Sequence, residues 1–159
     1  MSNPLATYLH DHLAGSNYLT ELLQTIRDKH PGEPLAAFAS ALLIEVEKDR
    51  EVVQGLIDRV GRAPVDMKQA AAWLAEKVSQ LKVRGDNGTG LGTFEALELV
   101  ALGILGKLSL WQTLKVISEA DDRLRGPDYE QLSARARAQH SQVEERRLQL
   151  ARTVLVAAT

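Results

Sequence analysis

The stretch Phe94-Glu-Ala-Leu-Glu-Leu-Val-Ala-Leu-Gly-Ile-Leu-Gly-Lys-Leu-Ser-Leu-Trp-Gln-Thr-Leu114 is apolar around most of a helical circumference. At about 100° per residue, its large apolar side chains point in nearly every direction and do not form one stripe. A helix of this kind must be covered by neighbouring elements on several sides. We therefore expect residues 93–121 to form a long, covered helix within a helical bundle.

Three further long helices are predicted from apolar stripes at helical spacing, over residues 4–29, 34–60 and 128–156. Asn3-Pro4 is typical of a helix N-cap followed by proline in the first turn, and Gly61 is typical of a helix end. Alternating strand patterns are absent from the sequence, and Ala, Leu, Glu, Gln and Arg dominate it. The predicted fold class is therefore all-α.

A shorter helix is predicted over residues 66–82, between the second and third long helices, because Gln69 follows Asp66 in capping-box spacing. At about 1.5 Å per residue, this segment could recross most of a bundle. Such a crossover lets the second and third long helices run parallel. We expect one domain over residues 1–159, an antiparallel four-helix bundle with this short extra helix in the crossover.

Composition restricts the partners of the chain. The net charge is −2 and the pI is about 6.1, which predicts no attraction to nucleic acid or an anionic membrane. Cysteine is absent, the first residues do not resemble a signal peptide, and the apolar run Leu97–Leu105 is too short to span a bilayer. We expect a cytoplasmic protein. The excess apolar surface of residues 94–114 predicts a homo-oligomer, with a dimer favoured.

A weak internal sequence similarity relates Val46-Glu-Lys-Asp-Arg50 to Val143-Glu-Glu-Arg-Arg147. With the helix order above, the chain resembles the ferritin-like four-helix-bundle superfamily over residues 4–156. Di-iron members of that superfamily carry Glu-x-x-His on two helices. Here Arg50 and Arg147 stand where the histidines would be, and arginine does not coordinate metal. The resemblance therefore implies a branch with degenerate metal ligands, without a catalytic activity or a cofactor.

Polar residues within the apolar stripes are candidates for a site. His12 and Asp49 lie near the centres of their stripes, and Arg147 lies about 40° from the centre of its own. Counting back and forward from turns near residues 31 and 126 places all three at one level of the bundle. A buried carboxylate needs partners. We therefore predict a buried polar layer of His12, Asp49 and Arg147 that fixes the helix register.

Two alternatives stay open. In the first, His12, Glu45, Asp49 and Glu98 form an altered ferritin-like site for iron, another divalent metal or a small ligand. In the second, the helix phases differ and these groups meet solvent. The corresponding functions are a non-catalytic module that acts by association, or a metal- or small-ligand-binding bundle.

Overall fold

The computed structural model describes residues 3–62, 72, 75–76, 79 and 88–156, and the secondary structure in these residues is helical, without strands. Four long helices form the bundle: α1 (Pro4–Lys29), α2 (Pro34–Val60), α4 (Leu91–Ile117) and α5 (Tyr129–Val154). A 3₁₀ helix, η1 (Asp122–Leu124), precedes α5. The predicted all-α class and helical bundle are therefore confirmed.

The helices begin and end at residues with the expected chemistry. The side chain of Asn3 accepts a hydrogen bond from the backbone N–H of Ala6, and proline opens α1 and α2. Gly61 ends α2 with a φ of 101°, a conformation that costs glycine little. Asp128 caps α5 by accepting from the backbone N–H of Gln131. These local signals place the helices that carry the site.

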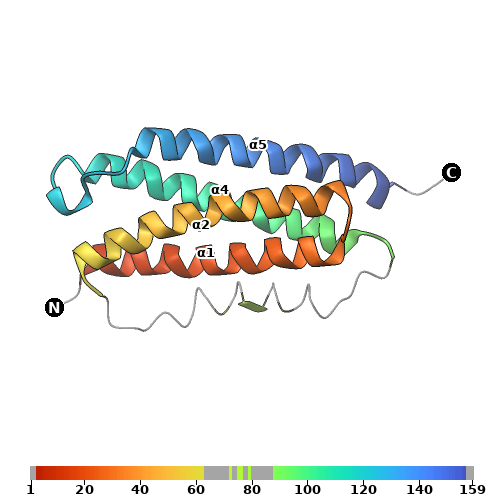
Figure 1. Cartoon of the computed structure of the whole chain (residues 1–159), viewed down its shortest axis with the longest axis horizontal. Coiled ribbons are helices and arrows are strands. Elements are labelled where there is room, and N and C mark those ends of the chain that lie inside the picture. The colour runs from red at the N-terminus through yellow and green to blue at the C-terminus, as the bar shows by residue number, and fades with distance from the viewer. Residues whose placement is uncertain (1–2, 63–71, 73–74, 77–78, 80–87, 157–159) are drawn as a thin grey trace.

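The four helices are arranged as two hairpins. Figure 1 shows α1 beside α2, joined by a short turn, and α4 beside α5. α1 also packs against α4, which brings the two hairpins together. The colour gradient in Figure 1 runs from right to left along both α2 and α4. The helices α2 and α4 therefore run in the same direction (Figure 1).

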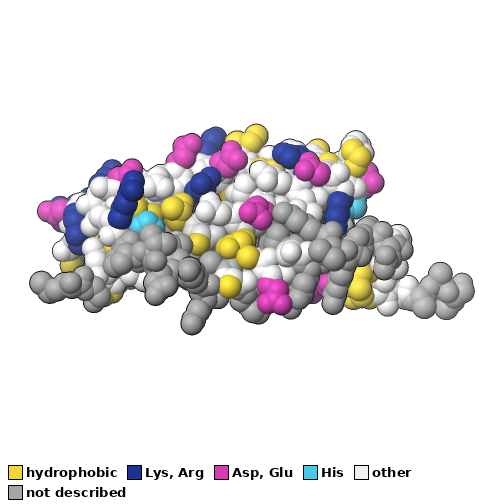
Figure 2. Space-filling view, turned by 90° about the horizontal axis from the view of Figure 1, so that it is seen from below, with side chains coloured by type: hydrophobic (Ala, Val, Ile, Leu, Met, Phe, Trp, Pro, Cys, Tyr) yellow, Lys and Arg dark blue, Asp and Glu magenta, His cyan; other side chains and the backbone are white. Residues whose placement is uncertain are grey.

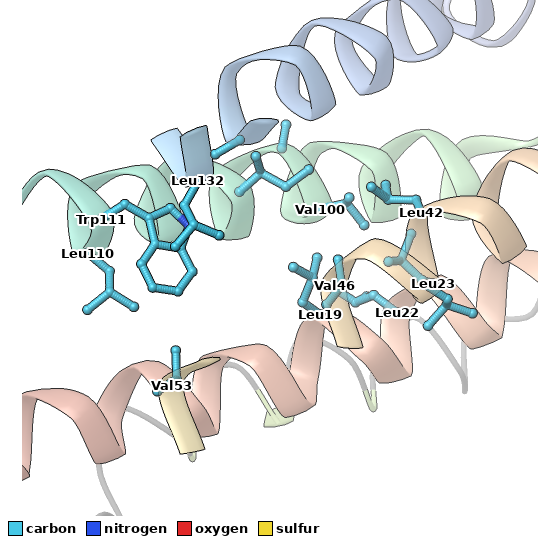
Figure 3. Packing of buried hydrophobic residues seen from close by; sticks show 14 of the residues in the cluster. Leu19, Leu22, Leu23, Leu42, Val46, Val53, Val100, Leu110, Trp111 and Leu132 are labelled. Atoms are coloured by element: carbon cyan, nitrogen blue, oxygen red, sulfur yellow. The ribbon is translucent and has the colours of Figure 1, made fainter. Parts of the chain in front are cut away.

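The core lies between the hairpins and is built mainly from leucine, isoleucine and valine. Figure 3 shows Leu110 and Trp111 of α4 pointing toward α1 and α2, and Val53 of α2 pointing back toward them. α4 is not covered all round, however. Leu102, Leu105 and Val116 keep 60%, 41% and 70% of their surface exposed. Burial is therefore strongest along the inner side of α4.

The short helix expected over residues 66–82 falls almost entirely outside the described residues. None of the described helices combines the length and the apolar character needed to cross a membrane. Figure 2 shows one face of the molecule, on which basic and acidic side chains are mixed among hydrophobic ones.

Candidate functional site

A carboxylate on α2 lies at the centre of a buried charged cluster. Asp49 is 2% exposed, and its Oδ2 atom accepts a hydrogen bond of 2.6 Å from Nζ of Lys107 on α4. Its other oxygen, Oδ1, accepts from Nη2 of Arg135 on α5. One carboxylate therefore joins three of the four long helices.

Gln139 of α5 extends this cluster to a second carboxylate. Its side-chain oxygen accepts a hydrogen bond of 2.6 Å from Nζ of Lys107, and its side-chain nitrogen donates to Glu45 at 2.7 Å. Gln139 is 1% exposed, so both ends of its amide need these partners. The cluster contains two carboxylates and two cations, and its formal charges cancel.

Burial and pairing with Asp49 shift the pKa of Lys107 in opposite directions. Removal of the ammonium group from water lowers the pKa of Lys107. The charge of Asp49 and its hydrogen bond oppose that shift. The ion pair with Asp49 is therefore what offsets the burial of a charge on α4.

A cavity of about 420 Å³ lies beside this cluster, between α1 and α4, with Asp49 and Val53 of α2 also in its wall. Three glycines in helix interiors line it: Gly15, Gly103 and Gly106. Among the described residues, a Cβ atom added at Gly15 or Gly106 would meet no atom within 4 Å. The missing side chains of these two glycines therefore leave space that no side chain in the described part of the chain fills.

The cavity wall is mainly apolar, with a few polar groups. Leucines line much of it: Leu19, Leu22, Leu99, Leu102 and Leu110. His12 also lines it and packs edge-on against Tyr8, with 4.6 Å between the ring centroids. Burial lowers the pKa of His12, and the charge of Asp11 opposes this shift. The imidazole is therefore favoured in its neutral form, which offers one donor and one acceptor.

The structure brings together two of the three residues predicted for the polar layer. His12 and Asp49 line the same cavity. Arg147 lies elsewhere, because its guanidinium donates to Glu144 at 2.7 and 2.8 Å and to Glu98 at 3.3 Å. Lys107 and Arg135, not Arg147, pair with Asp49.

The four residues of the alternative metal set do not gather around one point. Glu45 is bound by Gln139, and Glu98 pairs with Arg147. Within the described part of the chain, no three or more His, Asp or Glu side chains are grouped so that they could hold a metal ion. That alternative also allowed a small ligand in place of a metal. A small molecule beside His12 and Asp49 fits the cavity better than a metal ion does.

The prediction from the sequence did not include three residues of the cluster, Lys107, Arg135 and Gln139. Of these, Lys107 stands in a sequence context that indicates burial. It is the only charged residue between Glu98 and Lys115, in a segment otherwise made almost entirely of apolar residues and glycine. A lone charge in such a segment predicts a buried partner. Arg135 and Gln139 lie among other polar residues of α5 and carry no comparable signal.

Comparison with protein-family models, with curated proteins and with solved structures gives no match for this chain.

Proposed function

We propose that this chain is a non-catalytic helical bundle that binds a small, mostly apolar molecule in the cavity between α1 and α4. The observation that carries the proposal is the cavity itself. Its volume of about 420 Å³ lies within the range of about 300–1,000 Å³ typical of ligand pockets. Its wall is mainly apolar with a few polar groups, which is the usual composition of such pockets.

The glycines support this proposal independently. Four glycines lie in the interiors of the described helices, and Gly15, Gly103 and Gly106 line the cavity while Gly55 does not. Each costs roughly 0.5–1 kcal/mol of helix stability relative to alanine. Close packing of the described helices does not explain Gly15 and Gly106, because a Cβ there would meet no atom of these helices within 4 Å. Open space for a ligand gives these two glycines a role.

In the same proposal the bundle is ferritin-like and antiparallel, with the charged cluster in place of a di-metal centre. Two observations support this arrangement. The bundle consists of two hairpins, and α2 and α4 run in the same direction (Figure 1). Asp49 and Glu45 of α2 are satisfied by Lys107 and Gln139, so these carboxylates have partners without a metal. We further propose that the protein resides in the cytoplasm.

Binding of a neutral fluorescent probe tests the ligand function. N-phenyl-1-naphthylamine should bind the wild-type protein saturably with one site per chain. Gly106→Leu should weaken this binding at least about tenfold, because the new side chain occupies the cavity. Gly55→Leu is the matched control, since Gly55 lies in a helix interior, has open space around it and does not line the cavity.

Circular dichroism must show that both variants keep the helical content of the wild type. Equal probe affinity in the wild type and Gly106→Leu would contradict the proposal, and so would the absence of saturable binding to the wild type.

A second candidate function is self-association through α4. The exposed side chains of Leu102, Leu105 and Val116 lie within about 60° of one another around the helix axis. This apolar face would be covered in a homodimer. Light scattering after size-exclusion chromatography should then give a dimer for the wild type and a monomer for Leu105→Glu, with Ile44→Glu on α2 as the exposed control. A monomeric wild type at tens of micromolar would exclude this candidate.

A further inference from the structure

We infer that the cavity takes an uncharged amphipathic molecule, a long apolar body that carries one hydroxyl or carbonyl group, and that His12 binds this polar group. The inference rests on the proposed ligand-binding function and names the class of ligand. It follows from the charges that surround the cavity, from the free hydrogen-bonding groups in its wall and from its shape.

The charges argue against an ionised ligand. Each charged member of the cluster has a partner of opposite charge or an amide within hydrogen-bond distance: Asp49 with Lys107 and Arg135, and Glu45 with Gln139. No member is left to neutralise a carboxylate, phosphate or ammonium group of a ligand. Asp11, which also lines the cavity, is exposed, so solvent screens its charge. Among the described residues that line the cavity, an ionised head group would therefore find no buried, unpaired counter-ion, which is strongly unfavourable.

The hydrogen-bonding groups match an uncharged head group. Among the described residues, the ring of His12 contacts Tyr8 edge-on and makes no hydrogen bond. A neutral imidazole offers one donor and one acceptor, and a hydroxyl group is complementary to both. Lys107 also lines the cavity, and two of the three donors of its ammonium group are used by Asp49 and Gln139. A hydroxyl or carbonyl oxygen can accept the third.

The shape of the cavity favours an elongated apolar body. Its lining residues extend along α1 from Tyr8 to Leu22, which is about 21 Å at 1.5 Å per residue. On α4 they extend from Leu99 to Trp111, which is about 18 Å. The apolar wall continues on both sides of His12. A straight or fused-ring hydrocarbon with one polar group fits this outline better than a compact polar molecule.

Ligands with one chain and different head groups test the inference. 1-Dodecanol, dodecanoate and dodecylammonium, each below the concentration at which it aggregates, compete with N-phenyl-1-naphthylamine for the wild-type protein at pH 7.5. 1-Dodecanol should bind at least about tenfold tighter than either ion. Equal or tighter binding of dodecanoate or dodecylammonium would overturn the inference.

A histidine variant tests the proposed contact. His12→Phe keeps the apolar bulk of the ring and removes its donor and acceptor, so 1-dodecanol should bind about fivefold more weakly, the worth of one hydrogen bond of about 1 kcal/mol. The affinity of the probe, which has no hydroxyl or carbonyl group, should fall less than that of 1-dodecanol. His10→Phe is the matched control, because His10 lies on the same helix and does not line the cavity. Unchanged 1-dodecanol affinity in His12→Phe would overturn the role of His12.

These results separate the two proposals. If the probe binds in a manner that depends on Gly106 but the three head groups compete equally, the ligand-binding function stands and the inference about its chemistry is wrong. If the probe and all three chain ligands fail to bind, both are wrong.

Discussion

Replacing Asp49 with alanine should destabilise the protein by about 3 kcal/mol. The change removes the carboxylate that pairs with Lys107, whose side chain is 7% exposed. Breaking a buried ion pair by removing one partner costs about 3–5 kcal/mol, because the remaining charge stays buried. Arg135 also loses a partner, but its side chain is 33% exposed and solvent compensates it in part. We therefore expect a value near the lower end of this range.

Urea unfolding followed by circular dichroism measures this change. With a slope of about 2 kcal/mol per molar urea, a loss of 3 kcal/mol lowers the midpoint by roughly 1.5 M. Glu47→Ala is the matched control, since it removes an exposed carboxylate from the same helix. Its effect should stay within about 0.5 kcal/mol.

A double variant shows whether the loss comes from the pair itself. Asp49→Ala with Lys107→Met leaves no uncompensated charge on α4, so it should be at least about 1 kcal/mol more stable than Asp49→Ala alone. Two results would refute the reasoning. One is an Asp49→Ala melt that matches the wild type. The other is a double variant whose loss equals the sum of the two single losses.

Three further predictions concern the residues around this cluster. Gly15→Ala and Gly106→Ala should each raise the free energy of unfolding by about 0.5–1 kcal/mol, because the added methyl group meets open space and alanine favours helix; a loss in urea melts would mean that these positions are already filled. Burial lowers the pKa of His12 below 6.5, so between 6.5 and the folded-state value the unfolded chain binds more protons. As the pH is lowered below about 6.5, the free energy of unfolding should therefore decrease more steeply for the wild type than for His12→Phe. Parallel decreases of the two proteins between pH 7.5 and 5.5 would contradict this. Arg147→Ala should shift the urea midpoint far less than Asp49→Ala, since its partners Glu144 and Glu98 keep 28% and 47% of their side-chain surface exposed; an equal shift would show that Arg147 belongs to the buried cluster.

Helix positions could be derived from the sequence wherever local chemistry marks a boundary. Asn3-Pro4, Pro34 and Gly61 mark the ends of α1 and α2, which the structure has at Pro4–Lys29 and Pro34–Val60. The third long helix was expected over 93–121 and spans Leu91–Ile117. No glycine or proline lies between Ile117 and Gly126, so local signals could not locate this end.

The uncertain end of α4 explains why Arg147 was expected beside Asp49. The prediction placed the turn between the last two helices near residue 126. The observed pairs Lys107–Gln139, Lys115–Glu130 and Glu98–Arg147 are instead all centred near residue 123. Because the turn lies earlier in the sequence than expected, Gln139 of α5 lies at the same height in the bundle as Asp49. Arg135 reaches Asp49 from about one turn away through its long side chain.

The cavity could not be predicted from the sequence. The sequence shows Gly15, Gly103 and Gly106, but a glycine in a helix can serve either close packing or open space. The distinction depends on which side chains face it across the bundle. An added Cβ at Gly103 would lie 3.4 Å from Leu19, whereas one at Gly106, one turn away, would meet no atom of the described residues within 4 Å. Only the assembled helices separate these two cases.

A crystal structure of the protein grown with 1-dodecanol tests the central claim most directly. We expect the chain to lie between α1 and α4, against Gly15 and Gly106, with its hydroxyl oxygen within hydrogen-bond distance of the His12 ring. Protein side chains that fill the space over both glycines, with 1-dodecanol absent from it, would contradict the claim that this cavity is a ligand site.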